Sequence, residues 1–297
     1  MAEPNDLLLP GTLQERIRDC TEHALATGTL KPIPTECEVV SQDGVDFQVR
    51  IAPSLKEKIR EAREQQAREA TGQDADPFAV PEPDLYLGSL TPTHYGMLNK
   101  FPVLKHHLLI ITRGYEDQQA PLSHPDFEAL RRTLEEIDGL GFYNAGYPAG
   151  ASQPHKHLQL VPFPLDESEA GIPMEALLEP ATLADSPPTR TALPFPHAAC
   201  RVDFPGSSAR ELEHSYQGLR AHLGLERADA PYNLLVTRDW MLLVPRRGDR
   251  FQGVMINALG FAGGFLVRDR TDLEDLRRVG PMRVLQGVSG RLEDPDG

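Results

Sequence analysis

Residues 150–162 read Gly-Ala-Ser-Gln-Pro-His-Lys-His-Leu-Gln-Leu-Val-Pro, and this stretch is the most informative about the fold. Its second half alternates with the period of two that is typical of a β-strand. Side chains of a strand point to alternate faces, so His155, His157 and Gln159 should share one face. Lys156 should point away from it. Because two imidazoles and a carboxamide are costly to bury without partners, we expect a polar site opposite that face.

Three interpretations of that face are open from the residues alone. The first is a pair of structural histidines whose hydrogen bonds are satisfied within the fold. The second is a metal site, but zinc needs a third ligand, and the next carboxylate, Asp166, follows two prolines. The third is nucleophilic catalysis, because an imidazole with an ordinary pKa of about 6.5 is largely neutral at pH 7 and can attack phosphorus. Spacing does not decide among them.

The residues around this stretch resemble one known family. Residues 150–159 resemble the active-site signature of the diadenosine tetraphosphate phosphorylases, also called ATP adenylyltransferases. These enzymes form a branch of the histidine-triad superfamily and are related to galactose-1-phosphate uridylyltransferase. Other matching blocks occur in the same order, at 99–112, 141–146, 231–237, 240–246, 260–267 and 280–285. The resemblance covers roughly residues 30–290.

The hydrophobic patterns predict an α+β chain with a mostly antiparallel sheet and flanking helices on one side of it. Predicted helices lie at 12–26, 54–70, 125–138, 173–179, 209–224 and 271–279. Predicted strands lie at 84–90, 93–98, 105–112, 141–147, 155–162 and near 261–267, with hairpins at 38–51 and 232–245.

The resemblance implies two histidine-triad-like halves that pack as one body. The irregular, proline-containing segment 163–205 marks a junction between them. We therefore place an N-terminal nucleotidyltransferase domain at 1–205, which carries the His-x-His-x-Gln motif. A C-terminal ATP adenylyltransferase subdomain follows at 206–297.

The composition is that of a globular protein with a strong acidic excess. Among 297 residues, 44 are acidic and 30 are basic, a net charge of −14. This charge disfavours nucleic acid, which needs a basic face, whereas a small polyphosphate needs only local positive charge. No apolar run approaches the roughly 18 residues of a membrane span, and the acidic N-terminus is unlike a secretory signal. Three cysteines without C-x-x-C spacing indicate reduced thiols, so we expect a cytoplasmic protein. From the charge and the lack of a long apolar run, we expect no nucleic-acid and no membrane partners.

The resemblance implies reversible phosphorolysis of diadenosine tetraphosphate by phosphate to ATP and ADP, through a covalent adenylyl-histidine. His157 matches the nucleophile, and His155 would orient the strand. Gln159 stands where hydrolytic relatives carry a third histidine, and its carboxamide can donate to phosphate but is neither acid nor base at neutral pH. The positions that resemble nucleotide-binding ones are Lys56, Asn99, Lys100, Asn144, Gly150, Ala151, Ser152, Gln153, Asn233, Leu242 and Arg246.

Two alternative functions stay open. One is another nucleotidyl transfer on the same scaffold, either uridylyl transfer to a sugar phosphate or an ADP–sulfate exchange. The other is nucleotide binding without catalysis. The partners that we expect are small molecules, namely the nucleotides diadenosine tetraphosphate, ATP and ADP, together with phosphate. We expect no metal ligands and no tightly bound cofactor, since the sequence shows no cage for Mg²⁺, although that ion is compatible as a companion of the polyphosphate.

Overall fold

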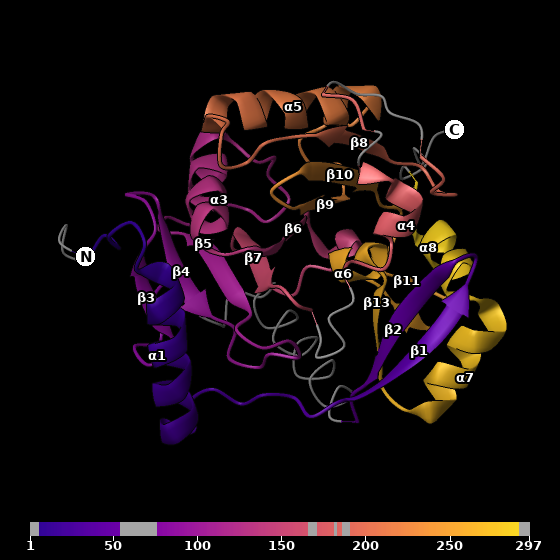
Figure 1. Ribbon diagram of the computed structural model, residues 1–297, viewed down its shortest axis with the longest axis horizontal. Coiled ribbons are helices and arrows are strands. Elements are labelled where there is room, and N and C mark those ends of the chain that lie inside the picture. The colour runs from indigo at the N-terminus through magenta and orange to yellow at the C-terminus, as the bar shows by residue number, and fades with distance from the viewer. Residues whose placement is uncertain (1–5, 54–75, 166–170, 181–182, 186–190, 291–297) are drawn as a thin grey trace.

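The largest element of the structure is an eight-stranded sheet in which every neighbouring pair is antiparallel (Figure 1). The computed structural model describes residues 6–53, 76–165, 171–180, 183–185 and 191–290. In spatial order the strands are β3 (Tyr86–Ser89), β4 (His94–Leu98), β5 (Leu108–Thr112), β7 (His157–Pro162), β6 (Gly139–Asn144), β9 (Tyr232–Val236), β10 (Trp240–Pro245) and β8 (Ala198–Arg201). The predicted antiparallel α+β fold is confirmed.

Three helices cover one face of this sheet, namely α1 (Leu13–Thr27), α3 (His124–Glu136) and α5 (Ala209–His222). Their apolar residues recur at helical spacing and join one core with the inward side chains of the strands. Leu158 and Leu160 of β7 belong to this core. The central strand is therefore anchored from the helical side. Each of these helices begins and ends within two residues of its predicted bounds.

The opposite face carries a second layer, which corrects the prediction that helices lie on one side only. A three-stranded sheet consists of β1 (Glu36–Gln42), β2 (Val45–Ile51) and β13 (Gly264–Val267). With it lie α4 (Glu175–Leu178), α6 (Ala258–Ala262), α7 (Arg270–Val279) and α8 (Pro281–Val288). Figure 1 shows β1, β2, α7 and α8 together, well apart from α1 and α3. The short elements η1 (Tyr147–Ala149), β11 (Arg250–Phe251) and β12 (Val254–Met255) complete the chain.

The predicted hairpin at 38–51 has a local cause. Asp43 and Gly44 adopt positive φ angles of 53° and 80°, as a two-residue hairpin turn requires. The hairpin places alternate side chains of β2 in the core, while Gln48 and Arg50 point the other way. This geometry gives the second sheet a polar face toward the large sheet.

Some elements escaped prediction. β8 is a short run of small residues in an irregular stretch, and α6 and α8 were read only as parts of matching blocks. The predicted helix at 54–70 lies outside the described residues. β8 pairs with β10, so the large sheet crosses the proposed division between residues 205 and 206, and that division stays a prediction. Among the described helices, none has the length and apolar character needed to span a bilayer.

Candidate active site

The strand β7 lies in the sheet between β5 and β6 and positions the His-x-His-x-Gln motif. His157 is opposite Ile111 of β5, and Gln159 is opposite Leu109. Leu158 faces the helical core, whereas the rings of His155 and His157 both lie against Phe78, with centroids 5.9 and 5.2 Å from it. The alternation predicted from the sequence is confirmed.

The protonation of His157 is defined by its contacts. Its Nδ1 lies 2.8 Å from the carbonyl oxygen of His155, which can only accept a hydrogen bond, so the proton is on Nδ1. Burial lowers the pKa of His157 to about 4, and the ring is therefore neutral at pH 7. Within the described part of the chain, no hydrogen bond engages Nε2. That atom keeps its lone pair available for nucleophilic attack.

Both ring nitrogens of His155 have hydrogen-bond partners, in contrast to those of His157. Its Nδ1 lies 2.6 Å from a carboxylate oxygen of Asp76. Its Nε2 lies 2.9 Å from both the carbonyl oxygen and the hydroxyl of Thr112. Both ring nitrogens of His155 are thus engaged by neighbouring groups. His155 is therefore suited to support rather than attack.

A cavity of about 320 Å³ lies between the two sheets, on the side of Gln159. Five residues predicted for catalysis or nucleotide contact line it, namely Asn99, Asn144, Gly150, Ser152 and Gln159. The rest of the lining is mainly apolar, as in small-molecule sites that enclose a flat aromatic group. The structure therefore assembles a polar end beside β7 and an apolar remainder.

Four polar cavity residues were missed by the sequence reasoning, namely Gln48, Arg50, His107 and Asn257, which is the N-cap of α6. Gln48 and Arg50 enter from β2, where their alternation with Phe47, Val49 and Ile51 was equally typical of a solvent-facing strand. His107 precedes β5, and its Nε2 lies 2.9 Å from Oε1 of Gln159. Burial lowers the pKa of His107 to about 4. The sequence shows two adjacent histidines, His106 and His107, but its pattern does not indicate which of them lines the cavity.

Asn233 and Arg246 act on the loop that precedes the motif, and neither lines the cavity. Asn233 Nδ2 donates to Asn144 Oδ1 at 2.8 Å and to the carbonyl of Ala149 at 2.9 Å. Arg246 is fully buried and donates to Asn233 Oδ1, to Ala149 and to the carbonyl of Ile256. Burial lowers the pKa of Arg246 to about 9, which leaves the guanidinium charged at pH 7. These two residues fix the position of the turn at Ala149.

Other predicted residues lie apart from the cavity. Lys100 forms an ion pair with Glu82, with its Nζ 2.9 Å from each carboxylate oxygen. Leu242 is buried in β10 as part of the core, and Ala151 is buried without lining the cavity. The Gln153 Oε1 atom is buried and has no partner among the described residues. Lys56 lies outside the described residues.

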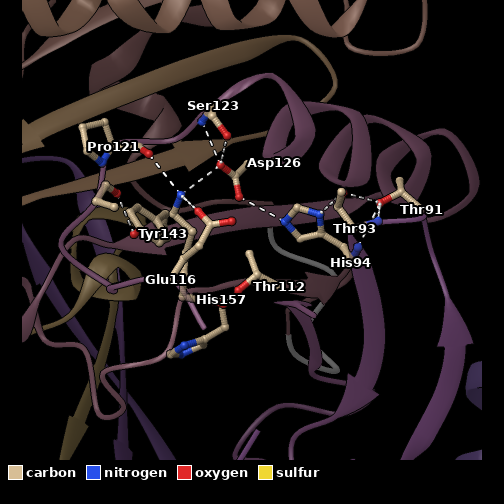
Figure 2. Close-up of polar contacts among 12 residues, drawn as sticks. Thr91, Thr93, His94, Thr112, Glu116, Pro121, Ser123, Asp126, Tyr143 and His157 are labelled. Atoms are coloured by element: carbon tan, nitrogen blue, oxygen red, sulfur yellow. Dashed lines mark hydrogen bonds and ion pairs between the residues drawn. The ribbon is translucent and has the colours of Figure 1, made fainter. Parts of the chain in front are cut away.

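The opposite face of the motif carries a buried charge network. Lys156 is 1% exposed, and its Nζ donates to Glu116 at 2.8 Å and to Asp126 at 3.1 Å. Asp126 also lies 3.0 Å from Nε2 of His94. Burial alone would raise the pKa of Asp126. The hydrogen bond from His94 and the charge of Lys156 outweigh burial and keep this pKa below its usual value. Figure 2 shows the His157 ring pointing away from this network.

Two other observations bear on the site. A hollow of about 840 Å³ lies beyond Phe78, but the Arg113 guanidinium in its lining is already paired with the Asp6 carboxylate. In the part of the chain that the structure describes, no group of three or more His, Cys, Asp or Glu side chains is arranged to hold a metal ion. Neither feature offers a better reaction centre than His157.

Comparison with known proteins agrees with this site. The family model described as Ap4A phosphorylase N-terminal domain matches residues 3–180, and that described as ATP adenylyltransferase C-terminal domain matches residues 191–290. These matches, with the fold and the histidine site, define the chain as a nucleotidyltransferase. It belongs to the family of diadenosine tetraphosphate phosphorylases, or ATP adenylyltransferases.

Proteins of Saccharomyces cerevisiae are similar over most of their length. Diadenosine 5',5'''-P1,P4-tetraphosphate phosphorylase 2 is 27% identical, with 91% of each chain covered, and Protein APA1 is 26% identical, with 88% of each covered. The crystal structure of yeast Ap4A phosphorylase Apa2 in complex with Ap4A has a TM-score of 0.80 at 25% identity, covering 97% of this chain and 100% of that one. The fold is therefore shared along nearly the whole chain.

Proposed function

We propose that this protein cleaves diadenosine tetraphosphate with inorganic phosphate, reversibly, and releases ATP and ADP. The observation that carries the proposal is the neutral His157, whose proton is held on Nδ1 while Nε2 keeps its lone pair. Family membership supports the nature of the transferred group, and yeast Ap4A phosphorylase Apa2, a relative of known structure, has been crystallised in complex with Ap4A. The small cavity beside Gln159 would take one nucleotide half.

The reaction has two half-reactions. In the first, Nε2 of His157 attacks the α-phosphorus of one adenosine, and the bond from that phosphorus to its bridging oxygen breaks. ATP leaves, and AMP stays on Nε2 as a phosphoramidate. In the second, an oxygen of inorganic phosphate attacks the same phosphorus, the P–N bond breaks, and ADP leaves. Dividing one displacement into two allows a single nucleotide position to serve both steps.

No proton needs to leave His157 during this cycle. When Nε2 binds phosphorus, the ring becomes positively charged, and its Nδ1–H remains bonded to the His155 carbonyl oxygen. A hydrogen bond from a charged donor is stronger than one from a neutral donor, so this contact stabilises the adenylylated ring more than the free ring. The backbone of His155 therefore contributes to the reaction as well as its side chain.

Gln159 suits a transfer to phosphate rather than to water. Its carboxamide can donate hydrogen bonds to phosphoryl oxygens, but it cannot take a proton from water at neutral pH. Phosphate brings its own negatively charged nucleophilic oxygen and needs no such base. We therefore expect the adenylyl-histidine to wait for phosphate.

The remaining parts of the proposal concern partners and setting. The ligands are small nucleotides and phosphate, with Mg²⁺ entering only as the companion of the polyphosphate. The net charge of −14 supports the absence of a nucleic-acid partner. A cytoplasmic location is supported by three cysteines without paired spacing.

The test is product analysis with labelled diadenosine tetraphosphate, with and without phosphate. We expect ATP and ADP only when phosphate is present, and little AMP. Parallel reactions with a uridine nucleotide–sugar and with ADP plus sulfate examine the two alternative transfers. The variant His23→Ala, which changes an exposed histidine of α1, is the matched control and should behave as wild type. Release of AMP without phosphate, or turnover of only a uridine donor, would contradict the proposal.

A further inference from the structure

We infer that His107 is a positioning residue that fixes the direction of the Gln159 carboxamide, so that its NH₂ group, and not its oxygen, faces the transferred phosphoryl group. This inference rests on the proposed function, because it describes how that reaction centre is built. A series of hydrogen bonds links Phe101, Asn99, His107 and Gln159, and each donor and acceptor in it can be assigned.

The series of hydrogen bonds begins at a backbone N–H group, which can only donate. The N–H of Phe101 donates to Oδ1 of Asn99 at 3.0 Å. That contact assigns the two ends of the Asn99 carboxamide, so Nδ2 is the atom that lies 3.2 Å from Nδ1 of His107. An amide nitrogen has no lone pair to offer. Asn99 therefore donates, and Nδ1 of His107 accepts.

The second step assigns the His107 proton. A buried ring with its pKa near 4 is neutral at pH 7 and carries one proton. Because Nδ1 accepts, that proton is on Nε2. Nε2 lies 2.9 Å from Oε1 of Gln159, to which it donates. The backbone of the same residues adds to this order, since the Asn99 N–H donates to the His107 carbonyl at 2.8 Å.

The third step concerns Gln159 itself. With Oε1 bonded to His107, the amide nitrogen is directed to the remaining open side, and Gln159 lines the cavity. Among the described residues no hydrogen bond uses this NH₂ group. A flipped carboxamide would bring its N–H groups against the N–H of His107 and would present an oxygen to a negatively charged phosphoryl group. His107 thus excludes the orientation that would oppose the reaction.

Gln48 provides a comparison within the same cavity. It is a buried carboxamide with no side-chain hydrogen bond among the described residues, so either of its ends can face a ligand. Gln159 differs because its oxygen is bonded to His107. The structure therefore fixes the orientation of the Gln159 carboxamide and leaves that of Gln48 free among the described residues.

A double-mutant cycle tests the inference. His107→Phe keeps a ring but removes both hydrogen bonds, and Gln159→Ala removes the group that His107 holds. We expect His107→Phe to lower kcat roughly tenfold to a hundredfold, with little change in the KM for phosphate, as expected for a weakened transition-state contact. The double variant should be no slower than Gln159→Ala alone. If the two losses multiply instead, His107 does not act through Gln159 and the inference is wrong.

A conservative variant separates positioning from general damage. In His107→Gln, one carboxamide could still accept from Asn99 and donate to Gln159, so kcat should recover well above that of His107→Phe. Equal rates for both variants would contradict the inference. Thermal unfolding of each variant verifies that the compared proteins are folded.

The tautomer can be measured on the unmodified protein, independently of any variant. The ¹⁵N shifts of the His107 ring should show its proton on Nε2 at pH 7. A proton on Nδ1 would overturn the inference even if wild-type turnover is normal. Absence of adenylyl transfer in the wild type, with the tautomer as expected, would instead contradict only the proposed function.

Discussion

The two faces of strand β7 differ in what they contribute. On one face, His157 and Gln159 are neutral groups that each keep one side-chain nitrogen without a hydrogen bond among the described residues, and Gln159 lines the cavity. On the other face, Lys156 is a charged group whose contacts all lie within the protein, with Glu116 and Asp126. The same five-residue motif therefore supplies a reaction centre on one face and an anchor on the other.

This difference shows why alternation matters more than composition here. Lys156 lies between two histidines in sequence, and a basic residue at that position would seem suited to hold phosphate. The strand directs the Lys156 side chain away from His157, toward Asp126 of α3. Because a buried ion pair needs additional hydrogen bonds to offset desolvation, the ammonium also donates to the carbonyl oxygen of Pro121. The charge of Lys156 is therefore held by carboxylates on the helical side of β7 and is not directed toward His157.

The largest expected effect is on the reactive face. His157→Ala removes the atom that forms the P–N bond, so adenylyl transfer should fall by more than about a thousandfold while the protein stays folded. His155→Ala removes support only and should leave reduced but measurable turnover. Steady-state kinetics and thermal unfolding of both variants distinguish these outcomes. Comparable residual rates in the two variants would mean that His157 has no special role.

The anchoring face should respond in stability first. Lys156→Met leaves Asp126 buried without its ammonium partner, and we expect the free energy of unfolding to fall by about 3 kcal/mol. Glu116→Gln is the matched control, because the Glu116 side chain is 50% exposed and its loss should cost less than about 1 kcal/mol. Chemical denaturation measures both. Similar costs for the two variants would contradict the anchoring role.

The pH dependence of activity reports on the buried histidine. Burial lowers the pKa of His157 to about 4, so the ring stays a competent nucleophile well below pH 6.5. The rate of adenylyl-histidine formation should be flat from pH 8 to about 5 and fall as pH decreases toward 4. Rapid-quench kinetics with labelled substrate give this profile. An acid limb centred near 6.5 would show that the ring is more exposed to water than the structure indicates.

The same shifts predict how stability depends on pH. His107 and His157 have folded-state pKa values of about 4, below the unfolded value of about 6.5. Between those values the unfolded chain binds more protons, so the free energy of unfolding should decrease as pH falls from 6.5 toward 4. The loss is on the order of 3 kcal/mol for each histidine. Denaturation of wild type and His157→Ala at several pH values should show a shallower slope in the variant.

The smallest effect is expected at Lys100. The sequence suggested contact with polyphosphate, whereas its Nζ is paired with Glu82 and the side chain is 38% exposed. From that pairing we expect Lys100→Ala to change kcat/KM less than about twofold, at low and at high salt. A large loss at low salt that shrinks at high salt would mean that Lys100 does reach the polyphosphate in the complex.

The sequence predicted what depends on local pattern. The strand periodicity placed His155 and His157 on one face, and helical spacing located α1, α3 and α5. The resemblance then indicated the family and selected residues such as Asn144 that line the cavity. Each of these inferences needs only neighbours along the chain or a matching block.

Contacts between distant segments could not be predicted in the same way. Strand β13, more than two hundred residues later in the sequence, pairs with β2. Because this pairing positions the hairpin opposite the large sheet, Gln48 and Arg50 line the cavity. Lys100 and Arg246 are basic residues in matching blocks, but their partners Glu82 and Ala149 are chosen by the fold. Burial and partner choice are tertiary properties, so residue type alone could not predict these contacts.

The most direct test of the central claim is to trap the intermediate. The protein is mixed briefly with diadenosine tetraphosphate labelled at the α-phosphate, without phosphate, and the labelled residue is identified by mass spectrometry. We predict AMP on Nε2 of His157, stable to base and labile to acid, and released as ADP when phosphate is added. Label on another residue, or full turnover with no protein-bound label, would contradict the covalent mechanism and favour direct attack by phosphate.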